Sequence, residues 1–558
     1  MQFLKELTGG GSWLRGYQRG WLRPDVLAGL TAAAVVVPKA MAYATIAGLP
    51  VQIGLYTALV PMVIYALLGS SRPLSVSTTT TIAILSGAAL GTVAPGGGTA
   101  ELITASATLA VMVGLVLLLA AALRLGFVAN FISEPVLVGF KSGIGLVIVV
   151  DQLPKLLGIH IDKAGFFRDL ASIAGHLPEV SVPTVVLSVA ILALIFVFER
   201  FVPRAPAPLV AVGLAIAVSG LFGLQALGVS TIGEVPRGLP SAVLPNLELV
   251  RELWPAAIGI ALMSFTETIA AGRAFTRPQE PRPVPNRELL AIGMANVGGG
   301  LLGAMPSGGG TSQTAVNDSA GAKSQMAQLV TAGTTLATLL LLAPLISLMP
   351  QAALAAVVIA YSIDLIQPVE FRGIRAVRTT EFRWALIAFA GVVLLGTLQG
   401  IVVAVIVSLL SLASQAYNPP VHVLRRKPGT TVFRPVSDEH PDDETWPGLL
   451  MLRVEGRVFF ANAQRVGDIV WPLVDEARPR VVLMDGRAMI DLEYTALKMF
   501  TEAEQKLRRS GTELWLAGLT PAVFAMIERS PLGAALGRER MFLNLQSAVE
   551  KYELEYSK

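Results

Sequence analysis

The sequence contains no cysteine among its 558 residues, and only 15% of those residues are charged. The absence of cysteine excludes disulfide frameworks, thiolate nucleophiles and cysteine-ligated zinc or iron–sulfur centres. Histidine is also scarce, and the four that are present show no metal-ligand spacing. We therefore expect neither a metal site nor a cofactor.

Hydrophobic residues make up 53% of the chain, and the mean hydropathy is +0.63. This balance lies outside the usual range of soluble globular proteins and predicts a membrane protein. The formal net charge of +4 is small for this length and gives no reason to expect nucleic acid as a partner. The apolar segments lack paired carboxylates, a metal site and a nucleophile beside a base, so an enzyme is not expected.

The long apolar runs are concentrated between residues 25 and 417, and this divides the chain into four parts. We predict a cytoplasmic N-terminal segment at 1–24, a transmembrane transport domain at 25–417, a linker at 418–448 and a soluble domain at 449–558.

Apolar runs of about 20 residues, the length that crosses a bilayer, predict about twelve spans and two shorter segments. The short segments follow Ser75 and Thr311. An even total places both termini on one side of the membrane. The predicted spans begin near Asp25, Gln52, Glu101, Glu134, Val182, Pro208, Trp254, Glu288, Met326, Gln351, Phe382 and Ile401.

Lysine and arginine gather in the loops on the same side as the N-terminus, as in the loop that carries Arg372, Arg375 and Arg378. The positive-inside rule makes that side cytoplasmic. We therefore predict a multi-pass protein of the inner (plasma) membrane, with its N- and C-termini in the cytoplasm.

The two short segments open with similar polar runs, SVSTTTT at 75–81 and PSGGGTSQT at 306–314. Short or glycine-interrupted segments in corresponding positions of two halves indicate broken helices whose N-termini face a site near the bilayer midplane. Because helix N-termini carry partial positive charge, the pattern predicts that an anion binds there.

The first of these runs offers backbone amides and the hydroxyls of Thr78, Thr79 and Thr80 as donors to such an anion. The alternative is that the threonines only satisfy groups at the helix end.

The soluble domain alternates strands with helices, which predicts a small α/β domain. The expected order is strand GLLMLRV, strand RVFFAN, helix AQRVGDIVWPLVDEA, strand RVVLMDG, helix YTALKMFTEAEQKLRRS, strand TELWLAG and a terminal helix.

Four stretches occur in an order typical of one family: VVPKAMAYATIAGLPVQIGLYTALVPMVIYALLGSSRPLSVS, FISEPVLVGFKSGIGLVIVVDQLPKLLG, IGEVPRGLP and VNDSAGAKSQMA. They resemble the SulP sulfate-permease family, which includes pendrin and prestin. In the soluble domain, the sequence is similar to STAS domains at GRVFFANAQRV, VVLMDGRAMIDLEYTAL and GTELWLAGLTP.

The resemblance covers almost the whole chain. It implies a membrane all-α fold of fourteen segments in two inverted seven-segment repeats, arranged as a core domain and a gate domain, plus a small cytoplasmic α/β STAS domain. It also implies a homodimer.

Carried onto this sequence, the resemblance places Lys39 where most members have glutamine, and Tyr43 one turn later as an aromatic lining residue. At the second short segment, Gln313 replaces an arginine of the animal members. The expected substrate-binding residues are Lys39, Tyr43, Thr78, Thr79, Thr80, Thr311, Ser312, Gln313 and Thr314.

Two charged residues in the predicted spans have alternative roles. Lys39 would bind the anion, or it would form a buried ion pair with Glu267. A carboxylate within a span is a functional candidate, so Glu267 would couple transport to a proton or a sodium ion. Its alternative role is a structural one, as a partner of Lys39 or Arg273.

The STAS-like domain lacks the phosphorylatable serine that follows the aspartate in anti-sigma-factor antagonists, because Leu492 follows Asp491 here. This predicts a role in assembly or trafficking rather than a phosphorylation switch.

The sequence thus predicts a secondary active transporter that moves a small anion, namely sulfate, bicarbonate, chloride or a dicarboxylate, by alternating access with proton or sodium coupling. The alternative is an anion-gated sensor or channel-like protein of the same fold. The expected partners of the transporter are the anion, the coupling ion, the lipid membrane and a second copy of the chain.

Overall fold

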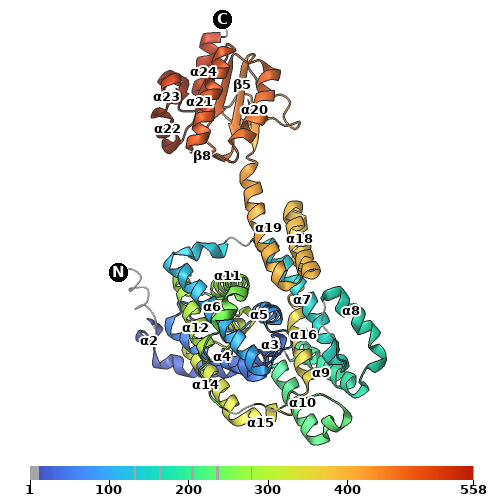
Figure 1. The fold of residues 1–558 in the computed structure, drawn as a ribbon. Helices are drawn as coiled ribbons and strands as arrows, with labels where there is room; N and C mark the ends of the chain where they lie inside the picture. The colour runs from blue at the N-terminus through green and yellow to red at the C-terminus, as the bar shows by residue number, and fades with distance from the viewer. Residues whose placement is uncertain are drawn as a thin grey trace. The chain divides into compact units, whose positions relative to one another are not determined.

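The computed structural model describes residues 12–130, 133–161, 165–202, 206–233, 235, 238–277 and 280–556. The chain divides into two compact units, Met1–Leu409 and Leu410–Lys558 (Figure 1). Each unit has its own hydrophobic core. The boundary lies within the last membrane helix, α19 (Thr397–Tyr417).

The first unit is mainly helical. Its helices before α19 are α2 (Ser12–Arg15), α3 (Leu22–Ile46), α4 (Val51–Leu68), α5 (Thr80–Val93), α6 (Thr99–Ala122), α7 (Glu134–Leu157), α8 (Phe166–Gly175), α9 (Val182–Phe201), α10 (Ala207–Phe222), α11 (Val250–Ala274), α12 (Pro285–Leu301), α13 (Thr311–Ser319), α14 (Met326–Ala337), α15 (Ala343–Ile346), α16 (Gln351–Ile363), α17 (Pro368–Val377) and α18 (Thr379–Leu395).

Each predicted span corresponds to one of these helices or to α19 and begins within about four residues of it, and the short segments correspond to α5 and α13. Among the described residues, nine helices are long and apolar enough to cross a membrane by length and composition. The difference arises because several predicted spans are shorter than 18 residues, such as α12 and α18 with 17 residues each.

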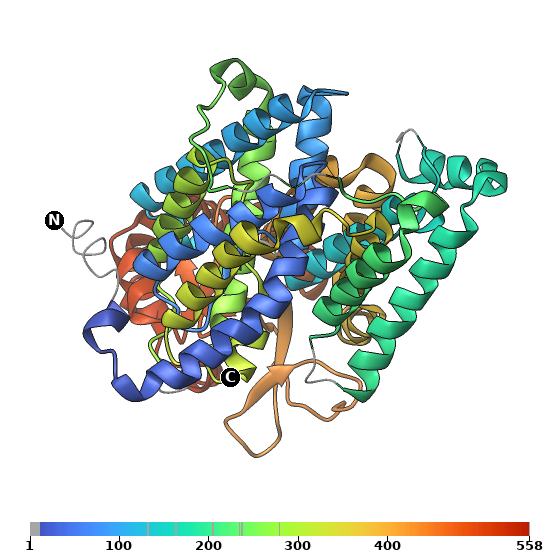
Figure 2. The same cartoon turned by 90° about the horizontal axis from the view of Figure 1, so that it is seen from below.

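The helices of the first unit form two groups. In one group α6 and α11 pack on each other, α12 packs on α4 and α6, and α14 packs on α3 and α4. In the other group α16 and α18 pack on α7, and α9 packs on α10 and α16. Helix α8 packs on α7 and so belongs to the second group as well. Figure 2 shows the part of this group formed by α8, α9 and α10 beside the first group, and α3 contacts both α10 and α16. These groups correspond to the expected core and gate.

A two-stranded antiparallel sheet lies within the first unit, which the expected all-α membrane fold did not include. It pairs β1 (Val76–Ser77) with β2 (Gly308–Gly309), in the register Val76↔Gly309 and Ser77↔Gly308. Each strand directly precedes a short helix, α5 or α13. The sheet therefore joins corresponding points of the two repeats.

The second unit contains a six-stranded sheet in the order β10-β9-β7-β5-β3-β4. Neighbours from β10 to β5 run parallel, and β3 is antiparallel to both β5 and β4. The strands and helices of this unit are β3 (Val421–Arg426), β4 (Phe433–Pro435), β5 (Leu449–Val454), β6 (Gly456–Val458), α20 (Ala463–Ala477), β7 (Val481–Asp485), β8 (Met489–Leu492), α21 (Tyr494–Arg509), β9 (Glu513–Ala517), α22 (Pro521–Glu528), α23 (Pro531–Leu536), β10 (Met541–Phe542) and α24 (Leu545–Tyr556).

The central strands are buried on both faces, with side chains alternating between two cores. In β7, Val482 and Met484 join the core that includes residues of α20–α23, whereas Val481 and Leu483 join the core under α24. The prediction of a strand at RVFFAN is only partly right. Pairing with β8 ends at Val458, and Asn462 closes a turn by accepting from the Phe459 amide at 2.9 Å.

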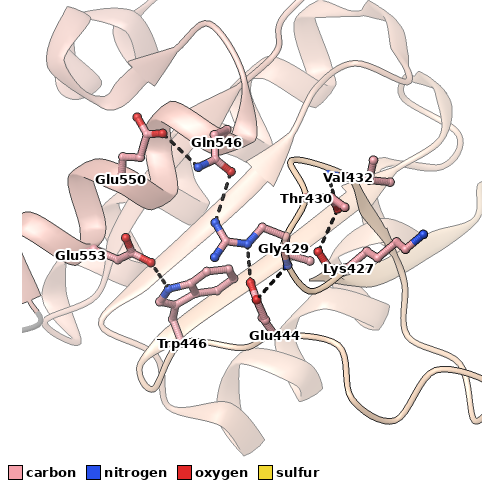
Figure 3. A network of polar contacts seen from close by, with 10 residues as sticks. Lys427, Gly429, Thr430, Val432, Glu444, Trp446, Gln546, Glu550 and Glu553 are labelled. Carbon is pink, nitrogen blue, oxygen red and sulfur yellow. Dashed lines mark hydrogen bonds and ion pairs between the residues drawn. The ribbon is translucent and has the colours of Figure 1, made fainter.

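The predicted linker contains β3 and β4, so it takes part in this sheet. Arg426, at the end of β3, forms an ion pair with Glu444 and donates to Gln546 of α24 (Figure 3). Its guanidinium also lies 4.7 Å from the centre of the Trp446 ring. These contacts fix the segment before β5 to the helix that ends the chain.

Candidate functional site

The β1–β2 pairing brings the N-termini of α5 and α13 to one place. Thr79 is the N-cap of α5 and accepts from the Ile82 amide at 3.3 Å. On the other side, the amide of Gly310, the N-cap of α13, donates to the Ser75 carbonyl at 3.0 Å. Two helix ends with partial positive charge therefore lie on either side of one short ladder.

Glycine in β2 allows this ladder to lie against α11. A Cβ on Gly309 would lie 2.8 Å from Thr268 Cα, and one on Gly308 would lie 2.9 Å from Ser264 Oγ. The same two α11 side chains bind the unwound backbone: Thr268 accepts from the Gly309 amide at 2.8 Å, and Ser264 donates to the Ser307 carbonyl at 2.7 Å. Side chains thus replace the missing helical hydrogen bonds.

Polar side chains also cross from one repeat to the other. The Ser77 hydroxyl donates to Gln313 Oε1 at 2.9 Å, and the Ser75 amide donates to Thr314 Oγ1 at 3.0 Å. Gln313 and Thr314 are both buried. Of the residues expected to bind substrate, these two hold the repeats together.

Lys39 of α3 reaches the same place from a buried position, with 3% of its surface exposed. Its ammonium donates to Ser312 Oγ at 2.7 Å and lies 3.6 Å from the centre of the Tyr361 ring of α16. Within the described part of the chain, no carboxylate lies within 4.0 Å of the ammonium, so the alternative of an ion pair with Glu267 is not seen.

Glu267 of α11 instead accepts from Thr79 Oγ1 at 2.8 Å. Glu267 as a whole is 7% exposed, so its carboxylate lies in a buried position at the end of α5. Nearby, Thr80 donates to the Tyr43 hydroxyl at 2.9 Å, which links α5 to α3.

The remaining predicted residues present polar groups. Thr311 and Ser312 are exposed, so the start of α13 is open to solvent. Thr79, at the start of α5, is half-buried. The hydroxyl of Thr78 is buried and has no hydrogen-bond partner among the described residues. All nine predicted residues lie on α3, α5 and α13 or at their ends. Sequence reasoning missed Tyr361, because a single tyrosine in an apolar helix carries no motif.

The arrangement can hold an anion but offers no covalent chemistry. One buried cation, two helix N-termini and several hydroxyls supply positive charge and donors. Among the described residues, no group of three or more His, Cys, Asp or Glu could hold a metal ion.

Two family models match the chain. The sulfate permease family matches residues 22–388, and the STAS domain matches residues 440–548. A probable sulfate transporter of Mycobacterium tuberculosis is 35% identical over 542 residues, which cover 96% of this chain and 96% of the relative.

Solved structures support the fold. The murine anion transporter Slc26a9 in the inward-facing state aligns with a TM-score of 0.92 at 22% identity, covering 99% of this chain and 95% of that chain. The transmembrane domain of the cyanobacterial bicarbonate transporter BicA aligns with a TM-score of 0.60 at 24% identity, covering 70% of this chain and 98% of that chain. The chain therefore belongs to the sulfate permease family of membrane anion transporters, with a STAS domain at its C-terminal end.

Proposed function

We propose that the chain moves a small anion across the membrane by alternating access, and that the anion binds between the N-termini of α5 and α13 beside Lys39. The observation that carries this proposal is the buried ammonium of Lys39, whose nearest partners are the neutral side chains Ser312 and Tyr361. A buried cation without a neighbouring carboxylate is costly, and an anion would offset that cost.

Each side chain has a distinct part in this scheme. The exposed hydroxyls of Thr311 and Ser312 meet the anion first, because the start of α13 is open to solvent. Lys39 then supplies full charge, and each helix end supplies a partial charge of roughly half a unit. Tyr361 belongs to the gate-like group, so its contact with Lys39 would change as the two groups move past each other.

Sulfate is our first choice of substrate, because the matching relative from Mycobacterium tuberculosis is named a probable sulfate transporter. Bicarbonate, chloride and a dicarboxylate such as fumarate are the competing choices. All of these anions would accept the same donors, so the site geometry alone does not rank them.

We assign Glu267 to coupling with a proton or a sodium ion. Its carboxylate bonds to Thr79, the residue that caps α5, so a change in its charge acts directly on the helix end that faces the anion. We further propose an inner-membrane location with both termini in the cytoplasm, and a homodimeric assembly.

The test is uptake of labelled sulfate, bicarbonate, chloride and fumarate into proteoliposomes at two pH gradients, with and without sodium. We expect saturable uptake of one of them, driven by the coupling ion in the wild type and independent of it in Glu267→Gln. The matched control is Glu101→Gln, which changes an exposed carboxylate in the first turn of α6.

If uptake by Glu267→Gln is saturable and still depends on the coupling ion, then Glu267 has no role in coupling, while the proposal of anion transport stands. No uptake of any of the four anions, with binding retained, would instead favour an anion-gated sensor.

A further inference from the structure

Helix α17 of the first unit lies outside the proposed anion site. α17 is a ten-residue helix between α16 and α18, and it buries none of its side chains. Only residues 364–367 separate it from α16, and only Arg378 separates it from α18. These short connections hold α17 next to the end of α16 and the start of α18, which both belong to the membrane unit.

The segment is basic. Residues 368–384 include four arginines and two glutamates, a net charge of +2. Arg378 forms an exposed ion pair with Glu381 at 3.3 Å. For Arg372, Arg375 and Arg383, which are all exposed, no carboxylate of the described residues lies within 4.0 Å. Three exposed cations therefore have no acidic partner within the described part of the chain, and the Arg375 guanidinium lies 5.8 Å from the centre of the Phe382 ring.

The same segment also exposes apolar side chains. Val369 is 71% exposed and Val377 is 85% exposed, and their spacing of eight residues puts them on one side of the helix. Phe371 faces the protein instead, with its ring centre 6.3 Å from those of both Phe382 and Phe389 of α18. α17 is thus attached by one side and presents valines and arginines on others.

This combination fits the boundary between lipid tails and headgroups. Amphipathic helices with basic polar faces lie in the membrane plane and are attracted to anionic lipids. Guanidinium groups bind phosphate oxygens through two parallel hydrogen bonds. Trp384, half-buried in the first turns of α18, is of the residue type enriched at this depth.

We propose that α17 is a binding surface for anionic phospholipid headgroups, held by Arg372, Arg375 and Arg383, with Val369 and Val377 entering the acyl boundary. The surface is separate from the anion site and does not depend on which anion is carried.

The test places the full chain in nanodiscs that contain photoactivatable phosphatidylglycerol or photoactivatable phosphatidylcholine. Mass spectrometry then measures the lipid cross-linked to residues 368–384. We expect more cross-linking to phosphatidylglycerol in the wild type. Each arginine near the surface contributes about a fivefold preference, so Arg372→Gln/Arg375→Gln/Arg383→Gln should lower the ratio of the two lipids at least fivefold.

Two further variants separate the effect of the arginine charges from the effect of the valines entering the acyl boundary. Val369→Ser/Val377→Ser should reduce cross-linking of both lipids and leave their ratio unchanged. Arg465→Gln/Arg509→Gln/Arg529→Gln removes three exposed arginines from the C-terminal unit and should change neither quantity.

The proposal is overturned if the wild type cross-links both lipids equally, or if the triple α17 variant keeps the wild-type ratio. It is also overturned if residues 368–384 cross-link to protein instead of lipid, because α17 would then be a protein-docking surface.

Discussion

At the residue scale, the feature that distinguishes this site is the lysine at position 39. The ammonium is buried in α3, where it donates to a hydroxyl and lies over an aromatic ring. In the proposed site the ammonium is therefore available to the anion, whereas an ion pair with Glu267 would have neutralised it. Glu267 instead accepts from Thr79, which leaves its carboxylate to the coupling role that we propose for it.

We predict that Lys39→Gln weakens anion binding about tenfold or more, because a charge-assisted hydrogen bond contributes about 1.5–3 kcal/mol. The measurement is the KM for uptake, together with the Kd of the purified protein for the same anion. Lys141→Gln, which makes the same change in α7, is the control and should leave both values unchanged. An unaltered KM and Kd in Lys39→Gln would remove this lysine from the site.

Much of the site could be predicted from residue type and spacing, because polar residues such as Thr78 and Ser312 stand out within apolar segments. The hydrogen bonds that these polar residues form could not be predicted. Gln313 was expected to face the substrate, yet its amide oxygen accepts from Ser77 of the other repeat. Tyr361 lies on Lys39 only because α16 packs against α3, and no local pattern encodes that packing.

At the element scale, the structure depends on how the unwound segments before α5 and α13 satisfy their backbone. Gln325 donates to the carbonyls of Ser71 and Leu74, and Asn317 donates to that of Pro73. At the start of the first segment, Glu288 of α12 accepts from Tyr65 and from the amide and hydroxyl of Ser70.

We predict that Glu288→Ala lowers stability by about 3 kcal/mol, because it leaves the Tyr65 hydroxyl and the Ser70 amide without their acceptor. Tyr65→Phe removes a single bond and should cost about 1 kcal/mol. Thermal unfolding of both variants in detergent measures the difference. A Glu288→Ala protein that unfolds at the wild-type temperature would mean that these bonds contribute nothing net.

Gly309→Ala should disturb the β1–β2 pairing, because its Cβ would lie 2.8 Å from the Thr268 backbone, which cannot yield as a flexible side chain would. We expect at least a tenfold loss of anion affinity, equivalent to about 1.4 kcal/mol. The matched control is Gly91→Ala in α5, where the added Cβ meets nothing within 4 Å, so anion binding should be retained. Equal affinities in the two variants would contradict a tight contact between β2 and α11.

The helices of the membrane unit could be predicted well, because apolar runs report span positions directly. Helix α7, for example, begins at the predicted Glu134. The β1–β2 ladder could not be predicted, since glycine-rich backbone carries no alternation of side chains. For the same reason, the sequence predicts that the segments at α5 and α13 are short, but it does not predict that β1 and β2 join them.

At the scale of the whole molecule, the chain is built from two units with separate cores. The C-terminal unit buries apolar side chains on both faces of its sheet, so it has what an independently folding domain needs. Asp485, at the end of β7, is buried and bonds to Arg453 at 2.7 Å and to Arg487 at 3.0 Å. Burial raises the pKa of Asp485, but the hydrogen bonds from Arg487 and Arg453 outweigh it and hold the pKa below its usual value.

We predict that residues 418–558 unfold cooperatively as an isolated domain, and that Asp485→Asn destabilises this domain by about 3 kcal/mol at pH 7. A depressed folded-state pKa stabilises the protein above the unfolded value, near 3.9, and this contribution is lost as the pH falls further. The gap between wild type and variant should therefore narrow below about pH 4, as denaturant unfolding at several pH values would measure. A gap that stays constant with pH would mean that the ionised carboxylate is not what stabilises the domain.

The β1–β2 ladder has a consequence for the stoichiometry of binding. Each repeat contributes one strand and one helix end, and neither repeat contains the ladder by itself. With the anion site that we propose, one chain therefore binds one anion rather than one anion per repeat, although its two halves are related in architecture. A chain severed between α10 and α11 should yield fragments that bind nothing separately and regain a single site when they reassociate.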